Sequence, residues 1–340
     1  MIPGIIELAV SFKRRLLAMD AAAARDMTRR WREVERALEG LIQELALQID
    51  EATRAGYPPT ETQIRGMERY QALLAQTLQE IRGLEREAEA VLIERSKAAA
   101  RMGLQDAQAL LEVGLRGGPY SRLSVDAVQY MAGMLQDGGP LFGVLQGRAL
   151  GPAAVQGLTQ RLIEGVALGW NPRKTARAMK DGLADGLQKA LVIARDSQMR
   201  AYRMASDEQL QNAFGGNQGT PLKQKRRLAA KDNRTCVACL LADGELLEIN
   251  EPMFDHTQGR CIAVPVFVDD EPEEPQGYFK TLPEEKQRAL LGPGRYELWR
   301  SGQVKLSDMA TRTQHAIWGP SPAVKTLTEL QAAIASPLAQ

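Results

Sequence analysis

The sequence predicts a mainly α fold with a small α+β region, and three observations support this class. Ala, Leu, Gln, Glu and Arg dominate the first half of the 340 residues, and aromatic residues make up only 5%, a composition that favours helices. Apolar residues recur every three or four positions in the N-terminal third, which is the period of one helix face. Short β-type runs begin after a loop at 215–221. The length favours two or three domains.

The N-terminal third is predicted to be a long antiparallel helical hairpin that ends near Gly103. The apolar seam of the first helix is Met27, Trp31, Val34, Leu38, Leu41 and Leu45. The seam of the second is Met67, Tyr70, Leu74, Leu78, Ile81, Ala88 and Leu92. Two interpretations stay open, because the seams either form a core within the chain or leave part of their length for self-association with another copy.

The connection between these helices carries clear stop and start signals. Gly56 suits a left-handed helix end, and Pro58 and Pro59 cannot continue a helix. Thr60 with Gln63 three residues later is the pattern of a capping box, so we expect the next helix to start there.

The remainder of the chain divides into a helical middle domain and a small C-terminal tail. Asn171 and Pro172 fit the N-cap and first turn of a middle-domain helix. The run CIAVPVFV alternates and predicts a strand at 261–268, and an acidic, Pro-rich linker follows. The tail is expected to hold one helix and a turn-rich end. The predicted boundaries are 1–118, 119–268, 269–277 and 278–340.

All three cysteines and one of the two histidines lie between Thr235 and Cys261. The apolar N-terminus contains Glu7 and is too short to span a membrane, so we expect no targeting segment and a reducing compartment, which disfavours disulfides. An Asp243-Gly244 turn is expected to close a β-hairpin that brings the four side chains together. The spacing predicts a tetrahedral zinc site of Cys236, Cys239, His256 and Cys261 in a knuckle at 235–265. Inert buried thiols and a redox Cys-x-x-Cys pair remain alternatives.

This predicted set of four protein ligands is closed, which favours a structural ion over a catalytic one. A zinc deaminase requires a His-x-Glu pattern, whereas Thr257 and Gln258 follow His256. The motifs of serine hydrolases, P-loop enzymes and zinc proteases do not occur in the chain. We therefore expect the protein not to be an enzyme.

A basic run precedes the first two cysteines. It contains Lys223, Lys225, Arg226, Arg227, Lys231 and Arg234. Because the net charge is only +1, any binding to double-stranded DNA would come from a local patch such as this one. The alternative is a solvated charged face, and no interleaved aromatic residue suggests base stacking. His315 stands alone and is expected to be an ordinary histidine.

Several of these segments, taken in order, resemble the phage head morphogenesis or minor capsid proteins of the phage Mu F type. The similar segments are IARDSQMRAYRMAS, then AAKDNRTCVACLLADGELLEI, then DHTQGRCIAVPV, and LIEGVALGWNPRKTARAM resembles the helix-Gly-helix entry that precedes them. The match spans roughly residues 140–268. Two departures stand out: Asp196 and Ser197 replace the Thr-Glu of that family, and Gly259-Arg260-Cys261 replaces its Cys-Arg-Cys end.

The resemblance implies a minor virion protein with a scaffolding role near the portal inside the head of a tailed bacteriophage or prophage. It assigns residues 119–268 to a head-morphogenesis domain. The implied partners are the portal protein, the major capsid protein or both, with no membrane, and the implied location is the capsid interior or portal region after assembly in the host cytoplasm. The alternative function is a zinc-stabilised DNA-binding protein that protects or guides packaged DNA ends.

Overall fold

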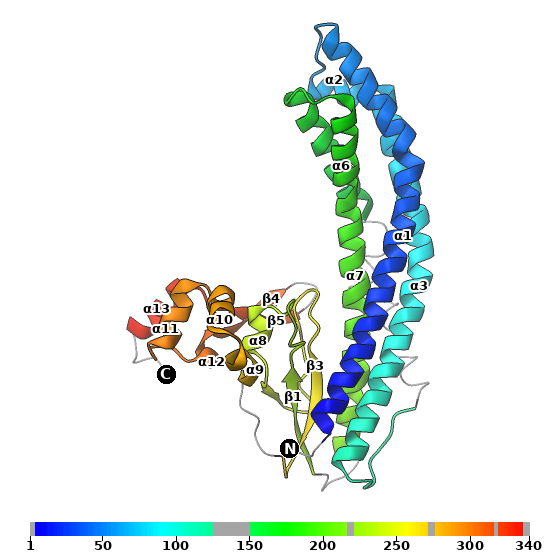
Figure 1. Ribbon diagram of the computed structural model, residues 1–340. Coiled ribbons are helices and arrows are strands. Elements are labelled where there is room, and N and C mark those ends of the chain that lie inside the picture. Colours follow the sequence, from blue (N-terminus) through cyan, green and yellow to red (C-terminus); the bar gives the residue numbers. More distant parts are fainter. Residues whose placement is uncertain (1–3, 125–149, 216–220, 271–275, 316–318, 336–340) are drawn as a thin grey trace. The chain divides into compact units, whose positions relative to one another are not determined.

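The computed structural model of the protein is mainly helical, with two small antiparallel sheets (Figure 1). This confirms the predicted mainly α class with a small strand region. The structure describes residues 4–124, 150–215, 221–270, 276–315 and 319–335. No helix within these ranges is long and apolar enough to cross a membrane.

The chain forms two compact units, each assembled from segments that are distant in sequence. The first unit contains Met1–Ala18, Lys97–Met131 and Met199–Gln340, and the second contains Met19–Ser96 and Ala132–Gln198. The long helices contribute one part of their length to each unit. The linear division at residues 118, 268 and 277 stays a prediction.

Five helices precede the first strand in the described part of the chain. They are α1 (Ile5–Arg54), α2 (Glu61–Gly66), α3 (Glu68–Gly114), α6 (Leu150–Ala167) and α7 (Pro172–Gly215). In the second unit their apolar faces form one core, in which Trp31, Leu38 and Tyr70 are almost completely buried. The predicted seams therefore lie on buried helix faces, although Leu41, Met67, Leu74 and Leu78 are only partly buried.

The predicted end of the second hairpin helix near Gly103 is wrong, because α3 continues to Gly114. The glycine serves close packing within the first unit instead. A Cβ atom at Gly103 would lie 2.2 Å from the backbone oxygen of Tyr202, so only glycine fits where α3 meets α7.

The predicted caps are confirmed. Thr60 and Gln63 form a reciprocal capping box at the start of α2, and Gly56 has a φ of +87°, in the left-handed region. Asn171 Oδ1 accepts a hydrogen bond from the Lys174 backbone at 3.0 Å, which caps α7 just before Pro172. These signals act within four residues, so no distant contact is needed to form them.

A three-stranded sheet and one short helix form the centre of the first unit. Its strands are β1 (Leu222–Leu228), β2 (Leu246–Leu247) and β3 (Ile262–Phe267), in the antiparallel order β2-β1-β3. β3 confirms the strand predicted at 261–268. The predicted hairpin at Asp243-Gly244 is wrong, because the preceding residues form α8 (Val237–Leu241) and β2 pairs with β1 instead.

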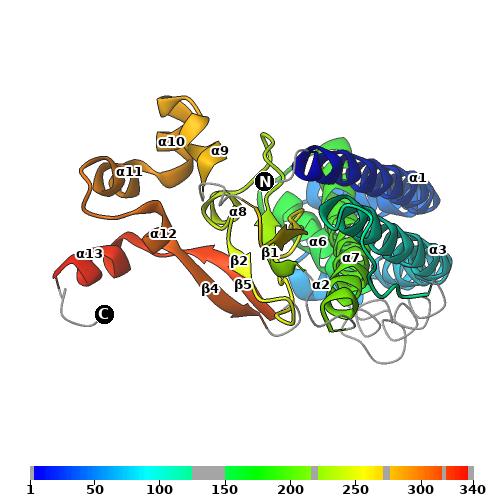
Figure 2. The ribbon, with the colours of Figure 1, turned by 90° about the horizontal axis from the view of Figure 1, so that it is seen from below.

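The C-terminal region is more structured than the predicted tail with one helix. It contains α9 (Gly277–Thr281), α10 (Glu284–Leu291), α11 (Pro293–Arg300), α12 (Leu306–Met309), β4 (Ala310–His315), β5 (Gly319–Val324) and α13 (Leu327–Ala335). Figure 2 shows β4 and β5 side by side as a two-stranded sheet. Pro283, Gly292 and Gly302 interrupt the helical pattern and produce short helices. Their core includes Leu240 and Leu241 of α8. The predicted linker at 269–277 lies largely outside the described residues.

Candidate metal centre

The structure brings the four predicted ligands together in the first unit, from three short segments around α8. Cys236 is the N-cap of α8, and its Sγ accepts a hydrogen bond from the Cys239 backbone at 3.4 Å. His256 lies in the loop that follows β2, and Cys261 directly precedes β3. Cys239 and Cys261 are buried, whereas Cys236 is exposed. The window of residues 236–261 is therefore one cluster in space, formed by a helix cap and a loop rather than by a β-hairpin.

The donor atoms of the cluster form two close groups that share Cys239. His256 Nε2 is 3.1 Å from Cys236 Sγ and 3.0 Å from Cys239 Sγ. In a tetrahedral zinc site an S···N edge is about 3.5 Å, as follows from Zn–S and Zn–N bond lengths of about 2.3 and 2.0 Å, so both distances are shorter than such an edge. Cys239 also belongs to a second close group with Asp255 and Cys261, whose donor atoms lie within 4.8 Å of one another. The four side chains would have to shift to place all their donor atoms around one ion, and a cluster of this composition could hold a metal ion.

The thiol of Cys236, one of the predicted ligands, has a lowered pKa and so loses its proton easily. The hydrogen bond from Cys239, together with His256, lowers the pKa of Cys236 to about 4, and the contact with Cys236 raises the pKa of His256 to about 9. The hydrogen bonds that Cys239 shares as donor with Cys236 and with Cys261, together with burial, raise the pKa of Cys239. His256 Nδ1 donates to the Thr257 carbonyl at 2.7 Å, which orients Nε2 toward the sulfurs. Binding of a metal ion exchanges such protons for the ion.

Asp255 is a functional residue that the sequence reasoning missed. Its Oδ1 accepts from the His256 backbone at 3.0 Å, and its Oδ2 accepts from the Cys261 backbone at 3.2 Å. Although burial by itself would raise the pKa of Asp255, the charges of Arg203 and Arg227 lower it. The carboxylate is thus engaged in orienting both neighbouring ligands, as outer partners of metal sites do. This leaves Cys261 as the better fourth ligand.

Arg203 of α7 joins the knuckle to the long helix. Its Nη2 donates to Asp255 Oδ2 at 2.9 Å and to the Gly259 carbonyl at 2.7 Å, and its Nε donates to the Cys261 carbonyl at 2.9 Å. A Cβ atom at Gly259 would lie 2.2 Å from the Asp255 carboxyl carbon. The Arg203 guanidinium therefore fixes the loop between His256 and Cys261. Glycine at position 259 lets this loop pass close to the Asp255 carboxylate.

A second ion pair holds the segment before Cys236. Arg260 donates to both carboxylate oxygens of Asp232, and Asp232 also accepts from the Thr235 hydroxyl and the Arg234 backbone, each at 3.0 Å. The Arg260 hydrogen bond holds the pKa of Asp232 well below its usual range. The Asp-x-Arg-Thr-Cys segment thus folds into a fixed turn that delivers Cys236 to the cluster.

The expectation that the basic run forms an exposed charged patch is wrong for its central residues. The first four cations of the run lie in β1, the middle strand of the sheet, and three of them, Lys225, Arg226 and Arg227, are buried. Lys225 Nζ pairs with Asp207 at 2.8 Å, and Arg227 pairs with Glu245 at 3.0 Å and with Asp255 at 3.6 Å. Buried cations that are already paired have no free charge for phosphates.

The other members of the run differ in exposure. Lys231 pairs with Asp243 at 3.0 Å, whereas Lys223 and Arg234 are exposed. The backbone of His315 lies in β4, opposite Gly319, and its role as an ordinary histidine stays a prediction.

Comparisons of the chain with protein families, with curated proteins and with solved structures find no match.

Proposed function

We propose that this chain is a minor head-morphogenesis protein of a tailed bacteriophage or prophage, with a scaffolding and non-enzymatic role near the portal inside the head. One observation supports this proposal above others. The three segments that resemble the Mu F type contact one another, through Arg203 from the first, Asp232 from the second and Asp255 and Arg260 from the third. These contacts support the proposal because the segments that resemble the family in sequence order also meet in space around one cluster.

In this proposal Cys236, Cys239, His256 and Cys261 hold a structural zinc ion. The ion would cross-link the cap of α8, the loop after β2 and the start of β3. Binding free energies of structural zinc are on the order of 10 kcal/mol, comparable with the whole stability of a domain. Since all four positions would be filled by protein, the ion would fix geometry and offer no site for a reacting group.

The alternative of direct DNA binding through the basic run loses its main support. Three of its six cations are buried in β1, and Lys231 is paired with Asp243. The exposed pair that remains, Lys223 and Arg234, is too small for the strong salt dependence of phosphate binding.

Co-sedimentation with purified portal and with procapsids tests the proposed function. We expect the full chain to pellet with portal, with procapsid or with both, and a variant such as Lys223→Met, which alters an exposed side chain, to behave like the wild type. A folded, metal-loaded protein that remains in the supernatant with both would contradict the proposal.

A further inference from the structure

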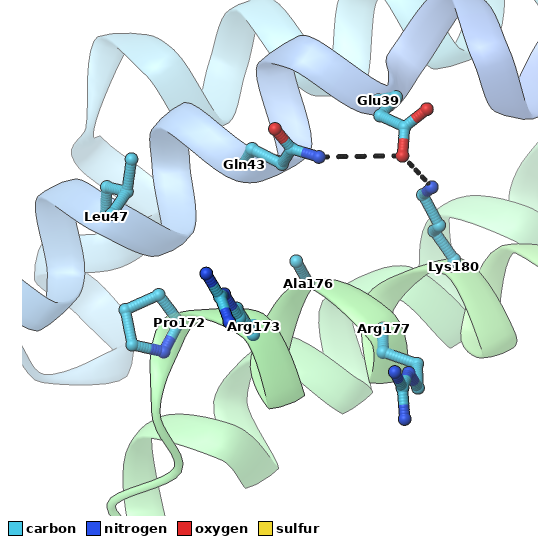
Figure 3. Close-up of a pocket in the computed structure, with 8 residues that line it drawn as sticks. All are labelled: Glu39, Gln43, Leu47, Pro172, Arg173, Ala176, Arg177 and Lys180. Atoms are coloured by element: carbon cyan, nitrogen blue, oxygen red, sulfur yellow. Dashed lines mark hydrogen bonds and ion pairs between the residues drawn. The ribbon is translucent and has the colours of Figure 1, made fainter.

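A groove in the second unit lies between α1 and the first turns of α7, and Figure 3 shows its walls. Its volume is about 500 Å³. Glu39 of α1 closes one end, where its Oε1 accepts from Lys180 Nζ of α7 and, at 3.5 Å, from Gln43 Nε2. The groove therefore runs along a fixed junction of two long helices.

The α7 side of this groove carries positive charge that no acidic residue of the described chain neutralises. Arg173 and Arg177 line it and are exposed, and the structure gives neither an ion-pair partner among the described residues. Lys174 beside them lies over the Trp170 ring, at 4.1 Å from its centroid. The first turn of α7 contains no acidic residue, although the positive end of a helix dipole favours acidic side chains over basic ones. Local rules broken in this way are typical of functional sites.

The remaining lining is apolar. Leu47 of α1 is 52% exposed, and Pro172 and Ala176 face the same groove from α7. Phosphates of a nucleic acid need cations and gain nothing from such a surface, whereas a peptide uses an apolar pocket for specificity and a charged rim for steering. The combination of charges and apolar lining therefore fits an acidic peptide better than DNA.

We propose that this groove docks an acidic segment of a partner protein, with carboxylates over Arg173 and Arg177 and an apolar side chain against Leu47 and Pro172. The inference goes beyond the scaffolding role, since it identifies a docking surface and the chemistry of its partner. The groove contains no residue of the metal centre. The peptide-binding test below can therefore fail while the co-sedimentation test of the proposed function succeeds, and the reverse.

Fluorescence anisotropy with a short labelled oligo-Glu peptide that carries one Leu tests this proposal on the full chain. We expect saturable binding that weakens by about tenfold or more in Arg173→Glu/Arg177→Glu, because both rim charges become repulsive. The control is Arg25→Glu/Arg86→Glu, which reverses two exposed arginines of the same unit outside the groove, and it should keep the wild-type affinity. Replacing the Leu of the peptide by Ser should also weaken binding.

Three outcomes would overturn the proposal. The first is no saturable binding of the Glu/Leu peptide to folded wild type. The second is an equal loss in the control variant, which would reveal a general charge effect. The third is a DNA duplex that binds the wild type, loses affinity in Arg173→Glu/Arg177→Glu and is not displaced by the peptide, which would make the groove a nucleic-acid surface. Circular dichroism of each variant confirms that it is folded.

Discussion

Replacing Arg203 by Met should destabilise the first unit strongly. The Arg203 side chain is 11% exposed and that of Asp255 is fully buried. The substitution keeps an apolar stem of similar size but removes the three hydrogen bonds of the guanidinium and leaves the Asp255 carboxylate with Arg227 at 3.6 Å. Breaking a buried ion pair by removal of one partner costs about 3–5 kcal/mol. Since Arg227 remains, we expect a loss near the lower end, about 3 kcal/mol in the free energy of unfolding.

Urea unfolding of protein purified without chelator, followed by circular dichroism, measures this loss. The matched control is Lys223→Met, an exposed cation of β1, which should change the stability by less than about 0.5 kcal/mol. Adding Asp255→Asn to Arg203→Met removes a buried charge that has lost its closer partner, so the double variant should recover part of the loss, with a coupling energy of about 1–3 kcal/mol. A loss below about 1 kcal/mol for Arg203→Met, or strict additivity in the cycle, would refute the buried pair as the link between α7 and the knuckle.

Two further substitutions test the packing and the charges of the same unit. Gly259→Ala would place a Cβ atom 2.2 Å from the Asp255 carboxyl carbon, so urea unfolding should show a loss of about 1–3 kcal/mol, and wild-type stability would contradict the close packing. Burial raises the pKa of Asp106 from 3.8 to about 6, against hydrogen bonds from Tyr202 and Arg15 that lower it. Folding therefore favours the protonated form, and the stability that this group contributes below about pH 4 is lost as the pH rises through about 6. Relative to Asp106→Asn, the wild type should lose about 1–2 kcal/mol between pH 4 and pH 7; a difference that does not change with pH would contradict this.

The elements that the sequence predicts well depend on neighbouring residues. Thr60 and Gln63 meet across one helical turn, and Asn171 reaches a backbone group three residues away. Trp31 and Leu38 repeat on one helix face and are buried. Such patterns need no knowledge of the rest of the chain. The spacing of the cysteines and His256 similarly predicted that they form a cluster. It did not predict that Cys236 would be the N-cap of a helix.

The parts that were missed depend on contacts across long sequence separations. The basic run gives no local sign that Lys225 will meet Asp207, because the partner lies in α7 rather than in the sheet. Asp255 precedes His256 directly, a position that suggests an outer-shell partner, but its link to Arg203 spans 52 residues. The acidic partners of a buried strand are set by the tertiary fold, so a charge run alone does not reveal whether it is displayed.

Elemental analysis of metal in protein purified without chelator tests the central claim most directly. We expect about one zinc ion per wild-type chain. The variant Cys239→Ser, which removes the ligand shared by both close groups of the cluster, should contain no stoichiometric metal and should unfold in the knuckle and sheet, as measured by hydrogen exchange. A wild-type protein without metal, whose sheet is protected from exchange to the same degree as in Cys239→Ser, would contradict a structural metal centre.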